Sequence, residues 1–139
     1  MFNQHLWSSL TPEWSTPEGV YNELDREFHF SMDPCPIGGT GGLDIPWTGS
    51  VFVNPPYGNE VKHWVKKGYE SAREGATVVM LVASRTDTRW WHDYCMKGEI
   101  RFIRGRLKFG GARNGAPFPS AIVVFKATIP KPDGRRSDV

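Results

Sequence analysis

The sequence predicts a reduced α/β sandwich, in which helices cover a mixed sheet whose last two strands form a C-terminal antiparallel hairpin. Three observations support this fold class. Short apolar runs, typical of buried strands, alternate with segments of helical periodicity. A glycine- and proline-rich loop at 110–119 separates the last two predicted strands, as in a hairpin. The 139 residues are enough for one domain with its own core.

Three segments have the features of helices. Residues 15–18 (Ser-Thr-Pro-Glu) predict a helix start, with capping hydroxyls, a proline in the first turn and an acid at the positive end of the helix dipole. Apolar residues at every fourth position from Val20 to Phe28 form the inward face of this helix. Residues 60–74 place apolar side chains on one face and basic side chains on the other. The third predicted helix is 88–96.

The strands are predicted from short runs of apolar and β-branched residues that lie between turn residues. The run 76–83 is apolar almost throughout, which is typical of a central strand covered on both faces. The segment 28–32 alternates weakly and ends at a turn. The full set of predicted strands is 28–32, 50–53, 76–83, 100–103, 106–109 and 121–125.

We expect one domain at 15–127, between an N-terminal arm at 1–14 and a basic, flexible tail at 128–139. No stretch approaches the roughly 20 apolar residues of a membrane span, and the N-terminus lacks a signal-peptide pattern. The sequence therefore predicts a cytoplasmic protein without a membrane partner. Cys35 and Cys95 lack metal-ligand spacing, so we expect free thiols and no metal site.

Charge is distributed unevenly along the chain. Residues 1–96 contain 7 basic and 12 acidic side chains, whereas residues 97–139 contain 10 basic and 3 acidic ones. The formal net charge of +2 therefore combines −5 in the first part with +7 in the second. A cationic segment favours a polyanionic partner; a solvated cationic surface without a partner is the alternative.

The tetrapeptide Asn54-Pro55-Pro56-Tyr57 follows the predicted strand 50–53, at the kind of strand end where open α/β sheets bind ligands. It resembles the catalytic motif of S-adenosylmethionine-dependent methyltransferases that act on exocyclic or amide nitrogens, notably adenine N6. The carbonyls of the Asn54 side chain and the Pro55 backbone would each accept an amino hydrogen and stabilise the positive charge on the attacking nitrogen. The two prolines remove two amide donors, and Tyr57 offers a face for an extruded base. The alternative is a proline-rich turn in which Asn54 caps a helix and Tyr57 packs.

The turn Asp33-Pro34-Cys35 is similar to the Asp-Pro-Phe/Cys start of the cofactor motif in amino-methyltransferases. Its aspartate would accept a hydrogen bond from the ammonium group of S-adenosylmethionine and balance its charge; a turn-initiating Asp-Pro is the alternative. The following segment 36–42 matches no standard glycine fingerprint. Asp44 is the nearest acidic residue for the ribose hydroxyls.

Ser15, Thr16 and Pro17 lie just before the Asp-Pro turn in sequence, an order that resembles permuted amino-methyltransferases. Their hydroxyls and the free N–H groups of the helix start would hold the cofactor carboxylate, as helix N-termini hold anions. The same residues are also an ordinary helix cap. Trp47 is a candidate to stack on the cofactor adenine, with a buried core tryptophan as the alternative.

Taken in order, these motifs resemble the phage-type DNA N6-adenine methyltransferases of the small Dam family. The resemblance covers about residues 13–125. It implies a Rossmann-like methyltransferase sandwich, S-adenosylmethionine as methyl donor, adenine in DNA as acceptor and, for a phage gene, the cytoplasm of a bacterial host. The shared motifs lie at 13–17, 28–35, 43–49, 51–58, 81–92, 103–109 and 117–120.

The chain departs from the family pattern at 36–46 and lacks a separate target-recognition domain, so specificity would come from loops or from a dimer. The oligomeric state stays open. We expect four basic residues to contact the DNA backbone. They are Arg85, Arg106, Lys108 and Arg113. The alternatives are a non-catalytic DNA-binding relic of such an enzyme and a methyltransferase for RNA or protein glutamine.

Overall fold

The computed structural model describes residues 15–35, 41–111 and 114–128. Three predicted features lie wholly or mainly outside the described residues: the N-terminal arm, nearly all of the basic tail, and Arg113. Most of the glycine-rich segment before Asp44 also lies outside them. No helix in the described part of the chain is long and apolar enough to cross a membrane.

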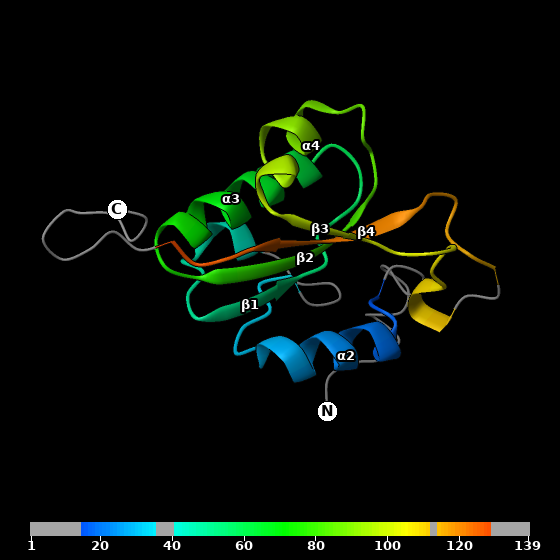
Figure 1. Cartoon of the computed structure of the whole chain (residues 1–139), viewed down its shortest axis with the longest axis horizontal. Coiled ribbons are helices and arrows are strands. Elements are labelled where there is room, and N and C mark those ends of the chain that lie inside the picture. Colours follow the sequence, from blue (N-terminus) through cyan, green and yellow to red (C-terminus); the bar gives the residue numbers. More distant parts are fainter. Residues whose placement is uncertain (1–14, 36–40, 112–113, 129–139) are drawn as a thin grey trace, which may run out of the picture.

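The described residues form an α/β fold around a mixed, four-stranded open sheet in the order β1-β2-β4-β3 (Figure 1). Strands β1 and β2 are parallel, and β4 runs antiparallel to both of its neighbours, β2 and β3. An isolated parallel bridge between Met32 and Val51 extends the sheet beyond β1. The strands are β1 (Ser50–Val53), β2 (Thr77–Ala83), β3 (Glu99–Phe102) and β4 (Ser120–Phe125).

Helices cover both faces of this sheet, as predicted for a sandwich. Helix α2 (Glu18–Phe28) lies on one face, and α3 (Val61–Arg73) and α4 (Arg89–Asp93) lie on the other (Figure 1). Side chains alternate along each strand, so that Phe52 packs in the core on the α2 side while Val51 packs in the core on the α3 side. The predicted central strand is confirmed, because every residue of β2 after Thr77 is buried.

A glycine lets α3 approach the sheet closely. A Cβ atom at Gly68 would lie 2.8 Å from the Met80 sulfur on β2. On the other face, Arg101 of β3 holds α2 through two hydrogen bonds to the Glu27 carboxylate, at 2.7 and 2.8 Å. The same guanidinium lies 2.6 Å from Glu99. These contacts fix one helix on each side of the sheet.

The predicted strand at 106–109 is wrong. The antiparallel hairpin at the sheet edge is formed by β3 and β4 instead. Gly105 and Gly110 have positive φ angles of 78° and 60°, which bend the chain away from a strand. A single backbone bond, 2.8 Å from the Ala116 N–H to the Leu107 carbonyl, takes the place of a ladder.

Three smaller predictions also differ from the structure. The segment 28–32 forms only the bridge at Met32, because His29 adopts a left-handed conformation directly after α2. The third helix is interrupted at Tyr94, whose φ and ψ of −125° and −54° are not helical. The predicted hydroxyl cap of α2 is wrong as well, because Pro17 occupies the N-cap position and no described side chain caps the helix.

Candidate active site

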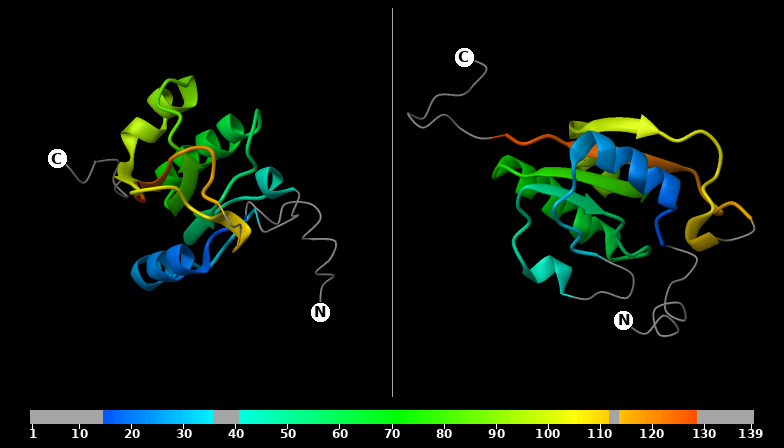
Figure 2. Two further views of the ribbon diagram at one scale, coloured as in Figure 1. Left: turned by 90° about the vertical axis from the view of Figure 1, so that its right-hand side faces the viewer. Right: turned by 90° about the horizontal axis from the view of Figure 1, so that it is seen from below.

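The candidate site lies at one end of the sheet, where several chain segments meet. The parallel strands β1 and β2 end there, and the antiparallel strand β4 begins there, with Ala83 paired to Ser120. The start of α2 lies beside the segments 103–111 and 114–119 at the same end, which faces the viewer in Figure 2, left. A backbone bond of 2.9 Å from the Gly110 N–H to the Ser15 carbonyl joins the first of these segments to the start of α2.

Asn54 lies directly after β1 and is held by the segment before α2. Its amide nitrogen Nδ2 donates a hydrogen bond of 3.0 Å to the Thr16 hydroxyl. The side chain does not cap a helix, because the N-cap of the following helix α3 is Glu60. Pro55 is buried and Pro56 is exposed. The structure therefore brings Thr16, a predicted cofactor contact, into direct contact with the predicted catalytic asparagine.

Tyr57 packs into a small aromatic cluster beside this turn. Its ring stacks on Phe118 with a centroid distance of 5.1 Å and an interplanar angle of 26°. Phe109 meets the same ring edge-on at 6.0 Å. Burial raises the pKa of the Tyr57 hydroxyl above its ordinary value. The predicted packing role of Tyr57 is thus observed, and stacking on a base would use the ring face away from Phe118.

Asp33 lies after Met32, in the segment that pairs with β1. One oxygen of its carboxylate accepts a hydrogen bond of 3.0 Å from the Cys35 N–H, which closes a tight turn. Desolvation by the surrounding protein raises the pKa of the Asp33 carboxyl, and this hydrogen bond opposes the shift. Cys35 is a free thiol, and burial next to Asp33 raises its pKa to about 12. Both predicted roles of Asp33, turn formation and cofactor contact, are compatible with this position.

Trp47 is a buried core tryptophan, which was one of its two predicted roles. Its side chain is 4% exposed and its ring lies 5.8 Å from that of Trp64. The indole N–H donates a hydrogen bond of 2.8 Å to the Gly42 carbonyl. Gly42 is itself so tightly packed that a Cβ atom there would collide with the Pro34 carbonyl. This packing fixes the Asp-Pro-Cys turn against the segment 41–47, while the stacking of Trp47 on an adenine stays a prediction.

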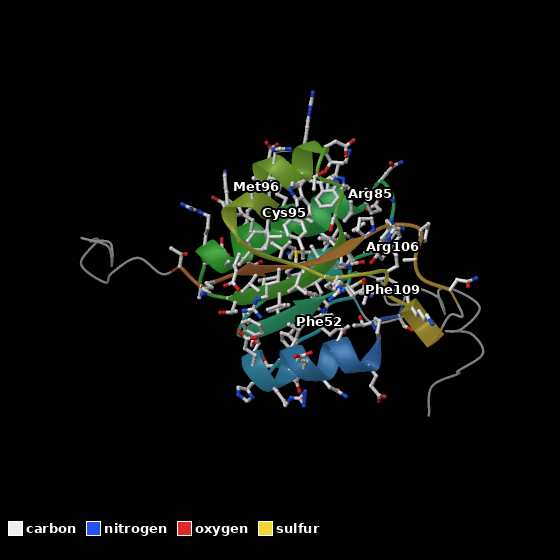
Figure 3. All side chains as sticks on the ribbon, turned by 45° about the vertical axis from the view of Figure 1, so that its right-hand side comes forward. Phe52, Arg85, Cys95, Met96, Arg106 and Phe109 are labelled. Atoms are coloured by element: carbon white, nitrogen blue, oxygen red, sulfur yellow. The ribbon has the colours of Figure 1, made fainter. Side chains whose placement is uncertain are left out.

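The predicted DNA-binding residues of the described chain lie at this same end. Figure 3 shows Arg85 and Arg106 on the side of the molecule where Phe109 lies. The Arg85 guanidinium lies 5.3 Å from the ring centroid of Phe118. Arg106 donates a hydrogen bond of 3.3 Å to the Ala116 carbonyl, and Lys108 is exposed. The site therefore combines an amide, an aromatic cluster and several cations.

Among the described cations, Arg101 and Lys126 form ion pairs, and both lie away from the candidate site. Arg101 and Lys126 form ion pairs with glutamates on the β3–α2 side of the sheet. Within the described residues, by contrast, no ion pair is formed by Arg85 or by the cations of the segment after β3. Nor does this part of the chain gather three His, Cys, Asp or Glu side chains that would hold a metal ion.

Comparison with known proteins identifies the family of the chain. A family model described as DNA N-6-adenine-methyltransferase (Dam) matches residues 4–133. The chain belongs to the Dam family. It is also 26% identical over 139 residues to the DNA N-6-adenine-methyltransferase of Haemophilus phage HP1 (strain HP1c1), across 84% of this chain and 80% of the phage protein. The predicted family is thus confirmed, and the family and this relative both indicate DNA adenine methyltransferase activity.

Several residues of this Dam protein that lie at the site were not predicted to be there. Phe109 and Phe118 form the aromatic cluster with Tyr57. The available sequence signal was the position of Phe118 between two prolines in a loop. Arg104 is exposed on the same segment as Arg106. Its sequence signal was the alternation of Arg104, Arg106 and Lys108 along this segment. Ser120 is buried, and among the described residues its hydroxyl has no hydrogen-bond partner.

Proposed function

We propose that this Dam protein uses S-adenosylmethionine to methylate the N6 amino group of adenine in DNA, with the adenine flipped out of the duplex into the Asn-Pro-Pro-Tyr turn. The observation that carries this proposal is the 3.0 Å hydrogen bond between the Asn54 amide and Thr16. It holds a carboxamide at the carboxyl end of β1, beside the stacked rings of Tyr57 and Phe118. An amide next to an aromatic ring offers what an adenine amino group needs: acceptors for its hydrogens and a surface for its ring.

The chain's own residues supply the acceptor side of the reaction. The Asn54 side-chain carbonyl and the Pro55 backbone carbonyl accept the two N6 hydrogens, which draws the amino nitrogen toward tetrahedral geometry and stabilises its developing positive charge. Neither residue 55 nor residue 56 has an N–H group that would repel the amino group. The ring of Tyr57 supports the base, and Phe118 holds that ring in place. When bound, S-adenosylmethionine supplies an electrophilic methyl group.

The residues beside this turn fit the amino-acid end of that cofactor by their chemistry. The first turn of α2 has no side-chain cap within the described residues, so its N–H groups and the preceding hydroxyls are suited to a carboxylate. Asp33 supplies a carboxylate for the ammonium group. Its strand pairs with β1 through Met32 and Val51, which brings both ends of the amino acid to the same end of the sheet. This arrangement supports a Rossmann-like methyltransferase fold.

The basic residues at this end suit a duplex whose adenine has left the stack. Arg85, Arg104, Arg106 and Lys108 are exposed there and would contact phosphates on either side of the flipped nucleotide. Flipping costs a few kcal/mol. Aromatic stacking of about 1–3 kcal/mol per base, together with the two amino hydrogen bonds, offsets this cost.

Methyl transfer from labelled S-adenosylmethionine to DNA without adenine methylation tests the proposal, with the modified nucleosides identified by mass spectrometry. We expect N6-methyladenine from the wild type and a rate about 10²- to 10³-fold lower for Asn54→Ala, the usual cost of losing a preorganised charge-stabilising group. Asn54→Asp is the matched control, because it keeps an acceptor at the same position and should retain more activity than Asn54→Ala. Equal thermal unfolding of the three proteins establishes that the fold is intact.

Two results would count against the mechanism. Wild-type turnover by Asn54→Ala would exclude the asparagine as the acceptor of the amino hydrogens. A wild type that binds DNA but transfers no methyl group to DNA would refute the proposed function itself.

A further inference from the structure

We propose that Thr16 is a positioning residue that sets which end of the Asn54 amide faces the adenine, and that cofactor binding sets this orientation through the Thr16 hydroxyl. The inference rests on the proposed function. It gives Thr16 a task on the acceptor side of the reaction, in addition to the predicted contact with the cofactor.

Thr16 is well placed to orient another side chain, because the backbone on both sides of it is anchored. The Ser15 carbonyl accepts a hydrogen bond of 2.9 Å from the Gly110 N–H, and the Pro17 carbonyl accepts one of 3.1 Å from the Tyr21 N–H in α2. Between these anchors, the Thr16 hydroxyl accepts from Asn54 Nδ2 at 3.0 Å in a partly buried position. Thr16 and Asn54 are 38 residues apart in sequence, so the contact is made only by the folded protein.

Orientation matters because the two ends of a carboxamide have opposite hydrogen-bonding character. The oxygen accepts hydrogens and the nitrogen donates them. Only the oxygen can receive a hydrogen of the adenine amino group, so a rotation of the amide by half a turn would set two donors against each other. Because Nδ2 donates to the Thr16 hydroxyl, the amide nitrogen points toward Thr16 and the amide oxygen points away from it.

A hydroxyl alone does not enforce this orientation, because it can either accept from Nδ2 or donate to Oδ1. If the hydroxyl proton is donated to another acceptor, the hydroxyl oxygen can only accept a hydrogen bond from Asn54. A carboxylate accepts hydrogen bonds and donates none. A cofactor carboxylate at the uncapped start of α2 would take the Thr16 proton, so that Oγ1 can only accept from Asn54. Cofactor binding therefore prepares the acceptor site, and the protein should bind its target adenine more tightly when the cofactor carboxylate is present.

The test compares Thr16→Val, which keeps the shape and removes the hydroxyl, with Thr16→Ser, which keeps the hydroxyl. The first readout is the affinity for a duplex that the wild type methylates, measured by fluorescence anisotropy with saturating S-adenosylhomocysteine or with 5′-methylthioadenosine, which lacks the amino acid. We expect S-adenosylhomocysteine to tighten DNA binding about tenfold in the wild type and in Thr16→Ser, a coupling of ordinary size. No tightening is expected in Thr16→Val, nor with 5′-methylthioadenosine in any of the three proteins.

The second readout is the rate of a single turnover with cofactor and DNA both saturating. Here Thr16→Val should be about 10- to 100-fold slower than the wild type, as expected for a misplaced reacting group, while Thr16→Ser should stay within about threefold of it. Under saturation, weaker cofactor binding alone leaves this rate unchanged. The third readout is the ¹⁵N–¹H spectrum of the Asn54 side-chain amide, identified by its absence in Asn54→Asp.

Each outcome bears on the inference. A wild-type single-turnover rate for Thr16→Val would overturn it, and equal loss in Thr16→Ser would assign the effect to packing of the threonine methyl group. If the wild type transfers no methyl group, the proposed function fails. In that case the amide spectrum still decides the geometry, because Asn54 signals that are unchanged by Thr16→Val would refute the positioning contact.

Discussion

Two turns follow neighbouring segments of the sheet at the same end, and they are stabilised in different ways. The turn at 33–35 is closed locally, by a hydrogen bond between residues two positions apart. The turn at 54–57 is held by distant parts of the chain: Thr16 binds its first residue, and Phe118 stacks on its last. The Asp33 carboxylate is therefore oriented by a hydrogen bond within its own turn, whereas Asn54 and Tyr57 are oriented by contacts with distant segments. The variants below separate the two.

The largest effect is expected from removing the support of the remote turn. Phe118 is 3% exposed, belongs to the core on the α2 side of the sheet and stacks on Tyr57. Phe118→Ala should lower the free energy of unfolding by about 3 kcal/mol, the cost of deleting a buried phenylalanine, and should slow methyl transfer as well. Urea unfolding and single-turnover rates measure both. Phe102→Ala is the control, because Phe102 is 66% exposed, and its loss should change stability by only about 0.5 kcal/mol.

A smaller and more selective effect is expected at the local turn. Asp33→Asn keeps an oxygen that can accept from the Cys35 N–H, and so preserves the turn, but it removes the charge. Affinity for S-adenosylmethionine should fall about tenfold to a hundredfold, the range for a hydrogen bond to a charged group, while stability stays the same. Calorimetric titration measures the affinity. Asp93→Asn removes an exposed carboxylate from α4 and should leave the affinity unchanged; a wild-type affinity for Asp33→Asn would remove Asp33 from the cofactor site.

Lowering the pH should weaken cofactor binding through protonation of Asp33 in the turn at 33–35. Desolvation raises the pKa of Asp33, so its carboxylate becomes protonated, and loses the charge that balances an ammonium group, at a higher pH than an ordinary aspartate. Cofactor affinity should therefore be complete well above that pKa and fall as the pH is lowered through it, beginning above about pH 4. Titrations at several pH values measure this. A parallel pH dependence in Asp33→Asn would assign the effect to another group.

The smallest effects are expected at single cations near the two turns. Replacing Arg104, Arg106 or Lys108 by alanine should each reduce the slope of log affinity for DNA against log salt concentration by about 1, if each contacts one phosphate. Binding measured between low and moderate salt gives this slope. Lys126→Ala is the matched control, because Lys126 lies 3.4 Å from Glu99 in an ion pair. An unchanged slope in all three variants would exclude this segment from the DNA interface.

The same contrast explains how much of the fold was predictable from sequence. Strands β1, β2 and β4 and helices α2 and α3 were predicted because their apolar periodicity is a local property of the chain. The segment 106–109 was predicted as a strand from the same kind of pattern. Its apolar residues, Leu107 and Phe109, instead pack with the core on the α2 side without a partner strand. Alternation reports which side chains are buried, and does not report what the backbone pairs with.

The candidate site was predictable to the extent that its motifs are compact. Asn54 and Tyr57 were identified because four consecutive residues carry the pattern. The Thr16 hydroxyl was predicted to cap a helix or to contact the cofactor, and the cofactor contact stays a prediction. In the structure it accepts from Asn54, a contact that was not predicted. That partner, like Phe118, is set by which segments the sheet brings together, and a single sequence contains no measure of such distances.

The placement of β4 has a consequence for how this enzyme is made. Strand β4, the last strand of the described residues, pairs with β2 on one side and β3 on the other, and in the described structure β3 pairs with β4 alone. A nascent chain that stops short of Ser120 therefore has an unpaired β3 and an exposed edge on β2. Assembly of the sheet therefore requires the residues of β4, so chains cut before Ser120 should be insoluble rather than partly active.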